Sequence, residues 1–405
     1  MRSKFKTIYL CGAGGRGNIG AEAIMLAIIK LFQDRYENVR FILTSWYPER
    51  VRQLLSRIDG NFMAIRKEGI FDNPLELLKS DLFVTCGDVS ISESVVSFLP
   101  LYYAIRICTA KLLGRKVILL GTEAEKITKR INLFALKYLI GKTADYCIVR
   151  NEESFDNLKN IPVREPALLL GCEPSLTLLD SHLEGFEYRN DRISDSKLRV
   201  GFGLRDFFSK PFRINLVKMR LERSDVPEGE IADEMKQIID FTAKIGDYLI
   251  EQYDAQLIFI PHHYLPKKYK VILSDSEIAE MVIAKLRNPK DVVLIENNLH
   301  PFTVLSIYKK LDLVFSMRHH TNSFACHYHV PTFGYAIYEK IFSFFRHIGK
   351  EDMLIDPFQD DLDEIKARID KAIDEKEKIA GELEEALNRL RNHMNEALDI
   401  ALKEE

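Results

Sequence analysis

Short runs of β-branched and other apolar residues alternate with longer amphipathic runs along most of the chain. In the first half, these short runs predict strands at Thr7–Cys11, Arg40–Ser45, Leu82–Cys86, Lys116–Leu120, Tyr146–Val149 and Ala167–Leu170. The longer runs between them have helical spacing, as at Ile19–Gln33, Pro48–Leu55 and Val95–Leu113. Strict alternation of strands and helices predicts right-handed βαβ units and therefore a parallel sheet.

Residues 181–196 are polar, lack an apolar period and are predicted to be a linker. Beyond them, strands are expected at Arg199–Leu204, Gln256–Pro261, Val292–Ile295, Leu313–Ser316 and Thr332–Tyr335. Helices are expected at Glu230–Glu251, Ser276–Arg287, Pro301–Lys310, Thr321–His327 and Glu339–Arg346. The pattern thus predicts an α/β protein with two Rossmann-like, parallel-sheet domains that face a central cleft.

From Asp360 onward the chain reads as a long, highly charged helix with an apolar seam. The seam is short and diluted by alanine, which favours a helix packed across both domains over a coiled-coil homodimer. The predicted organisation is therefore an N-terminal domain at 1–180, a C-terminal domain at 197–358 and a long amphipathic helix at 359–405.

Composition narrows the functional classes. The 405 residues are 46% hydrophobic and 29% charged, which is typical of a globular protein and not of a disordered one. The net charge of −3 gives no reason to expect a nucleic-acid partner. Six cysteines without a CxxC pair suggest reduced thiols in a cytoplasmic protein. The longest apolar stretch, Val95–Leu120, contains four cations, so no transmembrane helix is expected.

A glycine-rich loop follows the first predicted strand. Gly12, Gly14 and Gly17 satisfy G-x-G-x-x-G, a pattern that lets the backbone approach a phosphate at a helix N-terminus. A dinucleotide site also requires an acidic residue at the end of the second strand, and Ser45-Trp46 stands there instead. A loop that contacts an anionic or sugar substrate is therefore preferred over a dinucleotide site, and a simple tight turn stays as the alternative.

Basic and histidine residues gather at predicted strand ends in the second domain. Arg318 and His320 follow one strand and open a helix, and Lys340 follows the next strand. Arginine and lysine bind carboxylates and phosphates, and histidine is the general acid available near neutral pH. The pattern predicts an anion pocket. A metal site at His262-His263 or His319-His320 is a minor alternative, because adjacent residues of an extended segment point to opposite faces.

Several motifs resemble those of the polysaccharide pyruvyl transferase family. Residues 17–24, Gly-Asn-Ile-Gly-Ala-Glu-Ala-Ile, are similar to its G-N-x-G-D-E-A-I motif, and residues 149–154 to its V-R-D-x-x-S motif. Pro261-His262 resembles another of its strand ends. The block from Met317-Arg318-His319-His320 to Tyr338-Glu339-Lys340 resembles M-R-L-H…Y-x-x-K and is the most specific of these matches.

This resemblance implies a GT-B-like fold and an enzyme that transfers a pyruvyl group from phosphoenolpyruvate to a sugar. The sugar would belong to a cell-surface glycan or its lipid-linked precursor, and the reaction would form a ketal with His320 as general acid. His320, Arg318 and Lys340 would be catalytic, and Arg150, Arg205, Arg318 and Lys340 would bind the donor anion. The acceptor would meet the N-terminal domain at Gly17, Asn18, Gly20, Glu22 and Asp88. No metal and no organic cofactor is expected.

The chain departs from the family pattern at Ala21, where the family has aspartate. Two alternatives therefore stay open: a GT-B glycosyltransferase that uses a nucleotide sugar, and a non-catalytic glycan-binding relative. A lipid-linked acceptor would bring the protein to the inner face of the membrane as a peripheral protein. Cations of the irregular segment could then touch anionic head groups, although a solvated loop is the preferred explanation for them; they are Lys210, Arg213, Lys218, Arg220 and Arg223.

Overall fold

The structure is a computed structural model of the 405-residue chain. It describes residues 5–12, 14–66, 73–87, 91–93, 99–160, 168–207, 230–263 and 273–403, and the backbone of 213–215 and 220–222. The chain divides into two compact units. Unit 1 comprises residues 1–182 and 388–405, and unit 2 comprises residues 183–387.

Unit 1 is built on a seven-stranded parallel sheet in the order β3-β2-β1-β4-β5-β6-β7. The strands are β1 (Thr7–Cys11), β2 (Arg40–Ser45), β3 (Asn61–Arg66), β4 (Leu82–Cys86), β5 (Lys116–Thr122), β6 (Tyr146–Val149) and β7 (Leu168–Leu170). The prediction missed β3, an edge strand. Its apolar run is only four residues long, Phe62 to Ile65, and Ala64 within it does not favour a strand, so the pattern does not distinguish it from a short helix.

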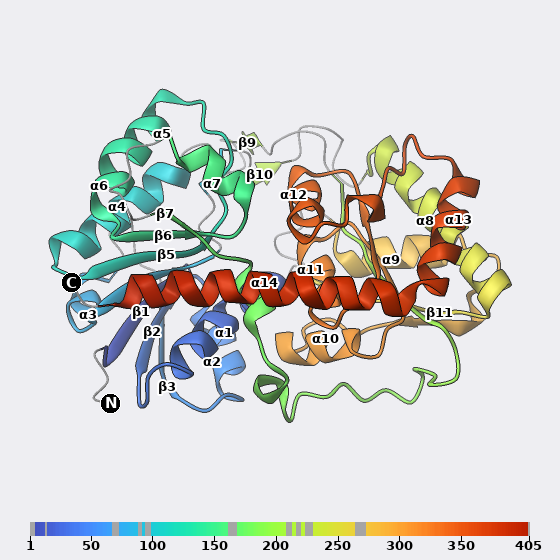
Figure 1. The fold of residues 1–405 in the computed structure, drawn as a ribbon, viewed down its shortest axis with the longest axis horizontal. Helices are drawn as coiled ribbons and strands as arrows, with labels where there is room; N and C mark the ends of the chain where they lie inside the picture. The colour runs from blue at the N-terminus through green and yellow to red at the C-terminus, as the bar shows by residue number, and fades with distance from the viewer. Residues whose placement is uncertain are drawn as a thin grey trace. The chain divides into compact units, whose positions relative to one another are not determined.

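Helices join the strands of unit 1. They are α1 (Ile19–Gln33), α2 (Pro48–Leu55), α3 (Pro74–Leu78), α4 (Leu99–Leu112), α5 (Arg130–Phe134), α6 (Gly141–Thr143) and α7 (Glu152–Leu158). A π-helical stretch, η1 (Ala135–Ile140), links α5 to α6 in one continuous helical segment. Alternate sheet residues such as Tyr9, Phe83 and Val117 form a core cluster that includes residues of α4 and η1. Figure 1 shows α4, α5 and α6 close together in unit 1. The predicted helix at Val95–Leu113 is α4, and residues 94–98 lie outside the described residues.

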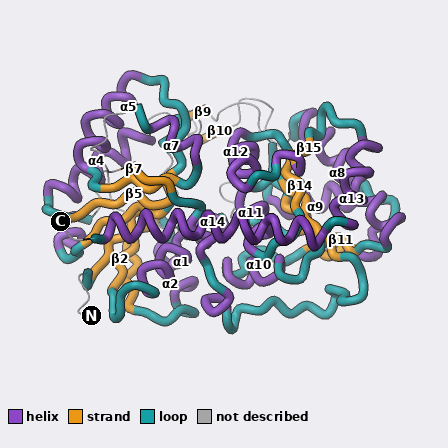
Figure 2. The backbone as a smooth tube through the Cα atoms, in the orientation of Figure 1, coloured by secondary structure: helices purple, strands orange, loops and turns teal. Residues whose placement is uncertain are grey.

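Unit 2 contains a six-stranded parallel sheet in the order β12-β11-β8-β13-β14-β15 (Figure 2). Its strands are β8 (Arg199–Gly203), β11 (Gln256–Phe259), β12 (Val292–Leu294), β13 (Leu313–Ser316), β14 (Thr332–Tyr335) and β15 (Leu354–Ile355). The five strands predicted here are present, and the two-residue β15 was too short to predict. Between β8 and β11, β9 (Arg213–Asn215) and β10 (Arg220–Glu222) pair in antiparallel fashion.

The helices of unit 2 are α8 (Asp233–Tyr253), α9 (Asp275–Ile283), α10 (Pro301–Tyr308), α11 (His319–His327), α12 (Glu339–Ile348) and α13 (Leu362–Asp374). Five of them correspond to predicted helices, and α13 is the first part of the predicted C-terminal helix. The ring of Phe202 stacks on that of Phe259 from one neighbouring strand and on that of Phe315 from the other. These pairs hold the sheet on which the strand-end residues described below depend.

The C-terminal region forms two helices instead of one, because the chain breaks at Glu375 between α13 and α14 (Lys376–Leu402). The apolar seam is buried within the chain: Ile369 is 0% exposed, Leu390 0% and Met394 0%. In unit 1, Arg391 of α14 donates to the carbonyls of Leu176 (2.8 Å) and Leu178 (3.0 Å). These residues of the seam are buried within the chain and are therefore not exposed for a coiled coil. The single long helix that the sequence predicted is two helices in the structure.

Candidate functional site

Four neighbouring strands of unit 2 end where the predicted anion-binding residues begin. In the sheet order β11-β8-β13-β14, these strands lead to His262, Arg205, Arg318 and Tyr338 respectively. Because the strands are parallel, their carboxyl ends share one edge of the sheet, where ligands bind in open α/β sheets. The fold thus collects at one edge residues that are far apart in the sequence.

Arg318 is held firmly at this edge. It is the N-cap residue of α11, its backbone N–H donates to Ser316 Oγ (2.8 Å) and its Nε donates to the Leu204 carbonyl (3.3 Å). Helix α11 lies directly against the end of β8, because a Cβ added at Gly203 would collide with Thr321. Glycine at this position lets α11, and with it Arg318, sit close to the strand end.

The guanidinium of Arg318 forms an ion pair with Asp275, a residue that the sequence analysis did not single out. Asp275 is 2% exposed and also accepts the backbone N–H groups of His262 and His263, both at 2.9 Å. Burial raises the pKa of Asp275, and Arg318 partly offsets this effect. A sequence signal for this region exists: Ser274 and Glu277 form a capping box at the start of α9.

Arg205 and Lys340 lie around the ring of Tyr338. The Arg205 guanidinium carbon is 5.1 Å from the ring centroid and Lys340 Nζ is 5.9 Å from it. Both distances are typical of cation–π contacts. Burial, followed by the charge of Arg318, lowers the pKa of Arg205. Asp206, which accepts the Leu273 N–H at 3.1 Å, is a further charge near Arg205. Among the described residues, three cations, Arg205, Arg318 and Lys340, thus lie at this edge together with the carboxylates Asp206 and Asp275, and the exposed Glu339 is next to Lys340 in the chain.

His320 lies in the first turn of α11, two residues after Arg318. Its ring is partly buried and contacts that of His319, with centroids 5.3 Å apart. His319 itself is buried against Phe344, at a centroid distance of 5.1 Å, so it supports the first turn of the helix. The predicted residues Arg205, Arg318, His320 and Lys340 all come from the same sheet edge of unit 2.

A buried histidine lies beside this cluster. His262 is 1% exposed and its Nε2 is 2.7 Å from the hydroxyl of Tyr308. Burial, followed by the charge of Arg318, lowers the pKa of His262 to about 3. Burial and the same charge also lower the pKa of His263 to about 3. Both rings are therefore neutral at pH 7. Protonation of either ring would place a second positive charge near Arg318 and is therefore unfavourable.

These shifts predict acid sensitivity of the fold. In the unfolded chain His262 titrates near 6.5, so between pH 6.5 and 3 the unfolded state binds more protons than the folded state. The neutral His262 therefore makes its full contribution to the free energy of unfolding above pH 6.5. Below pH 6.5 the free energy of unfolding declines, by about 2 kcal/mol for His262 between pH 7 and 5. Thermal unfolding of His262→Gln measured at both pH values should show a smaller decline than the wild type. An unchanged decline would contradict this assignment.

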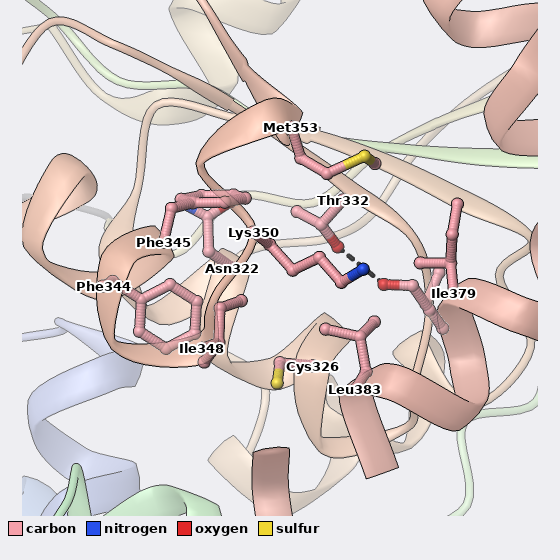
Figure 3. Close-up of a pocket in the computed structure, with 11 residues that line it drawn as sticks. Asn322, Cys326, Thr332, Phe344, Phe345, Ile348, Lys350, Met353, Ile379 and Leu383 are labelled. Atoms are coloured by element: carbon pink, nitrogen blue, oxygen red, sulfur yellow. Dashed lines mark hydrogen bonds between the residues drawn. The ribbon is translucent and has the colours of Figure 1, made fainter. Parts of the chain in front are cut away.

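A small cavity lies behind α11 (Figure 3). Its volume of ≈ 10 Å³ is about that needed by one water molecule, so it cannot hold a sugar or phosphoenolpyruvate. Asn322, two residues after His320, is 0% exposed, and its amide has no hydrogen-bond partner among the described residues. Figure 3 shows the ammonium group of Lys350 pointing toward Thr332 and Ile379. Lys350 pairs with Glu382 of α14, so the C-terminal helix helps to close this cavity.

Four of the residues predicted for the acceptor, Gly17, Asn18, Gly20 and Glu22, lie at the start of α1 in unit 1. Asn18 caps α1, since its Oδ1 accepts the N–H groups of Gly20 (3.1 Å) and Ala21 (3.4 Å). Gly17 has φ +71°, a conformation that favours glycine. The motif therefore has a clear local role: it turns the chain sharply after β1 and starts the helix. Asp88 lies outside the described residues.

Glu22 is fully buried and is paired with an arginine that the sequence analysis missed. Both oxygens accept from Arg50 of α2: Nε donates to Oε1 at 3.1 Å and Nη2 to Oε2 at 2.8 Å. Such a bidentate pair is strong and directional. Glu22 thus contacts Arg50 in this structure, and the pair fastens the start of α1 to α2.

Arg150 was predicted to bind the donor, but it contacts two carboxylates of its own unit. Its Nη2 is 2.5 Å from Glu123 Oε1 and its Nη1 is 3.3 Å from Glu173 Oε2. Glu123 follows β5, Arg150 follows β6 and Glu173 comes shortly after β7, so three adjacent strand ends build this triad. Arg150 is only 6% exposed, and its charge is compensated within unit 1.

Metal binding and membrane insertion are not apparent from the described structure. Across the described ranges, no three His, Cys, Asp or Glu residues gather as a metal site would require. Within those ranges, no helix is both long and apolar enough to cross a membrane. The five cations proposed to touch head groups have no described side chains, so that prediction lies outside the described residues.

Two solved structures of similar fold are distant from this chain in sequence. One is Alr3699/HepE from Anabaena in complex with UDP-glucose, with a TM-score of 0.58, 12% identity and coverage of 97% of this chain and 98% of that one. Another is UDP-GlcNAc 2-epimerase from Neisseria meningitidis bound to UDP-GlcNAc, with a TM-score of 0.59, 12% identity and coverage of 98% and 100%. These similarities confirm the GT-B-like fold with two Rossmann-like units.

The sequence comparisons identify the family. No curated protein matches the sequence significantly. The sequence model of the polysaccharide pyruvyl transferase family, in contrast, matches residues 18–337, which are most of the chain. The matched region runs from the glycine loop of unit 1 to the residue before Tyr338. The chain therefore belongs to the polysaccharide pyruvyl transferase family.

Proposed function

We propose that the protein transfers the pyruvyl group of phosphoenolpyruvate to a sugar of a glycan or of its lipid-linked precursor. The observation that carries this proposal is the group of cations at the sheet edge of unit 2, where Arg205 and Lys340 lie around Tyr338 and Arg318 lies near Arg205. Phosphoenolpyruvate carries a carboxylate and a phosphate, and arginine and lysine are the side chains that bind such groups. Three cations at one sheet edge suit a multiply charged anion.

The reaction needs a proton, two sugar hydroxyls and a leaving phosphate. In our proposal His320 protonates the methylene carbon of phosphoenolpyruvate, which becomes the methyl group of the product. One sugar hydroxyl adds to the central carbon and loses its proton, inorganic phosphate leaves, and the second hydroxyl adds to the same carbon and loses its proton to close the ketal. One of the two hydroxyl protons replaces the proton that His320 gave, and the other leaves with the phosphate. Cations at the sheet edge stabilise the charge that develops on the departing phosphate. None of these steps requires a metal or an organic cofactor.

The donor set in this proposal is Arg205, Arg318 and Lys340, without Arg150. The two carboxylates beside Arg150 compensate its charge and would repel an anionic donor. In this proposal Arg318 binds the donor and also neutralises the buried Asp275. Its removal would destabilise the fold as well as weaken binding, so Arg205 is the better residue for a test.

Calorimetric titration with phosphoenolpyruvate tests the proposal. We expect Arg205→Gln to weaken binding about 10- to 100-fold, since charge-assisted hydrogen bonds to the anion are lost. The matched control is Arg287→Gln, an arginine with a 66% exposed side chain at the end of α9, which should bind like the wild type. Wild-type protein that binds UDP-glucose but not phosphoenolpyruvate would overturn the proposal in favour of glycosyl transfer.

A further inference from the structure

We propose that residues 126–142 of unit 1 form a surface that docks on an anionic lipid membrane. This basic-aromatic segment carries five exposed cations and no acidic residue. The cations are Lys126, Lys129, Arg130, Lys137 and Lys142. The charge of the whole chain is −3, so this concentration of positive charge is local.

Large apolar side chains are exposed among these cations. Ile131 is 45% exposed, Phe134 54% and Tyr138 51%. Their spacing of three and four residues places them along one side of the helical segment formed by α5, η1 and α6. The rings of Phe134 and Tyr138 contact each other at 5.1 Å, and Lys142 Nζ is 5.3 Å from the Tyr138 ring. The result is an apolar strip flanked by ammonium groups.

The other side of the same segment is firmly packed. Ala135, Leu136 and Ile140 belong to the buried core cluster that also includes residues of α4. The segment therefore presents its exposed side chains from a fixed position, and binding would cost little conformational entropy. The middle of the segment, η1, is a π-helical stretch, and such stretches often occur at functional sites.

Glu93 fixes the beginning of the segment. Its carboxylate accepts the backbone N–H of Thr128 (3.1 Å), that of Lys129 (3.0 Å) and the side-chain amide of Asn132 (2.7 Å). Slight burial raises the pKa of Glu93, but these hydrogen bonds outweigh it and lower the pKa to about 2. The Glu93 carboxylate thus holds the turn before α5 and the first residues of the helical segment in place.

The composition of the surface selects the partner. Anionic head groups attract lysine and arginine, and aromatic and aliphatic side chains insert at the boundary between head groups and acyl chains. A nucleic acid would match the cations but would leave Ile131 exposed, since stacking needs rings. Membrane docking goes beyond the proposed transfer reaction and would bring the enzyme to a lipid-linked acceptor.

Vesicle flotation of the full-length protein, without any donor, tests this inference. Wild-type protein should float with vesicles of phosphatidylcholine and phosphatidylglycerol at 70:30, and binding should weaken with added salt. We expect Lys129→Glu/Lys137→Glu and, separately, Phe134→Ser/Tyr138→Ser to lower the affinity by at least about 10-fold. The matched controls, Lys290→Glu and Leu75→Ser, change exposed residues elsewhere and should bind like the wild type.

Three results would overturn the inference. They are a wild type that does not bind anionic vesicles at low salt, variants that bind as well as the wild type, and a surface that binds RNA but not vesicles. Circular dichroism melting of each variant verifies that it is folded. Because no phosphoenolpyruvate is present, a negative result leaves the proposed transfer reaction untouched, and a failure of donor binding does not affect vesicle binding.

Discussion

Replacing His320 with asparagine should lower the rate of ketal formation by about 10²- to 10⁴-fold, the usual contribution of a general acid. The affinity for phosphoenolpyruvate and the melting temperature should stay close to those of the wild type. His320 is in the first turn of α11, partly buried, and the neutral amide of asparagine is tolerated at a helix start. The measurement is release of inorganic phosphate in the presence of the sugar acceptor, with ketal formation followed by mass spectrometry.

A second histidine of the same region provides the control. His329 follows α11 at the opposite end from His320 and has φ +57°. Asparagine tolerates this backbone conformation well, so His329→Asn should keep both fold and activity. Turnover of His320→Asn equal to that of His329→Asn would exclude His320 as the proton donor. Loss of activity together with a large fall in melting temperature would point to a structural role.

Replacing Arg150 with methionine should destabilise unit 1 by about 3–5 kcal/mol and leave the affinity for phosphoenolpyruvate unchanged. Arg150 neutralises Glu173, which is 3% exposed, and Glu123, and removing one partner of a buried ion pair leaves an uncompensated charge. For a domain of this size, the loss corresponds to a fall in melting temperature of about 6–20 °C. Differential scanning calorimetry and donor titration measure the two quantities on one preparation.

Removing the charges together distinguishes an ion-pair effect from a packing effect. The triple variant Arg150→Met/Glu123→Gln/Glu173→Gln contains no unpaired charge and should recover much of the lost stability. The opposite outcome, weaker donor binding with an unchanged melting temperature, would return Arg150 to the donor site that its sequence motif suggested. A structural role of Arg150 thus predicts a lower melting temperature with unchanged donor affinity, and a donor-binding role predicts the reverse.

The elements of the fold could be predicted where the sequence pattern is strong. Central strands such as β4 and β13 are continuous apolar runs, because a parallel sheet is covered on both faces. The edge strand β3 was missed, because its apolar run of four residues, Phe62 to Ile65, is too short to be assigned to a strand or a helix from the pattern alone. The helical segment Arg130–Thr143 was also missed, because exposed Ile131, Phe134 and Tyr138 blur the amphipathic period by which helices are recognised.

The candidate site was predicted in its residue types but not in its pairings. Motif matches pointed to Arg318, His320 and Lys340, and parallel strands predicted that they share a sheet edge. Neither Asp275 beneath Arg318 nor Arg50 beside Glu22 could be foreseen, because both partners are more than 25 residues away along the chain. Ion pairs over such distances depend on which strands become neighbours.

The sequence by itself therefore determined the class of fold, the family and the residue types that gather at one edge of the sheet in unit 2, since periodicity and short motifs are local properties. The tertiary structure decided how the charged residues of the two units are paired. It paired Arg150 with Glu123 and Glu173, leaving Arg205 and Lys340 around Tyr338. The physical reason is that the charge an arginine offers to a ligand depends on its buried neighbours, and only the folded chain brings those neighbours together.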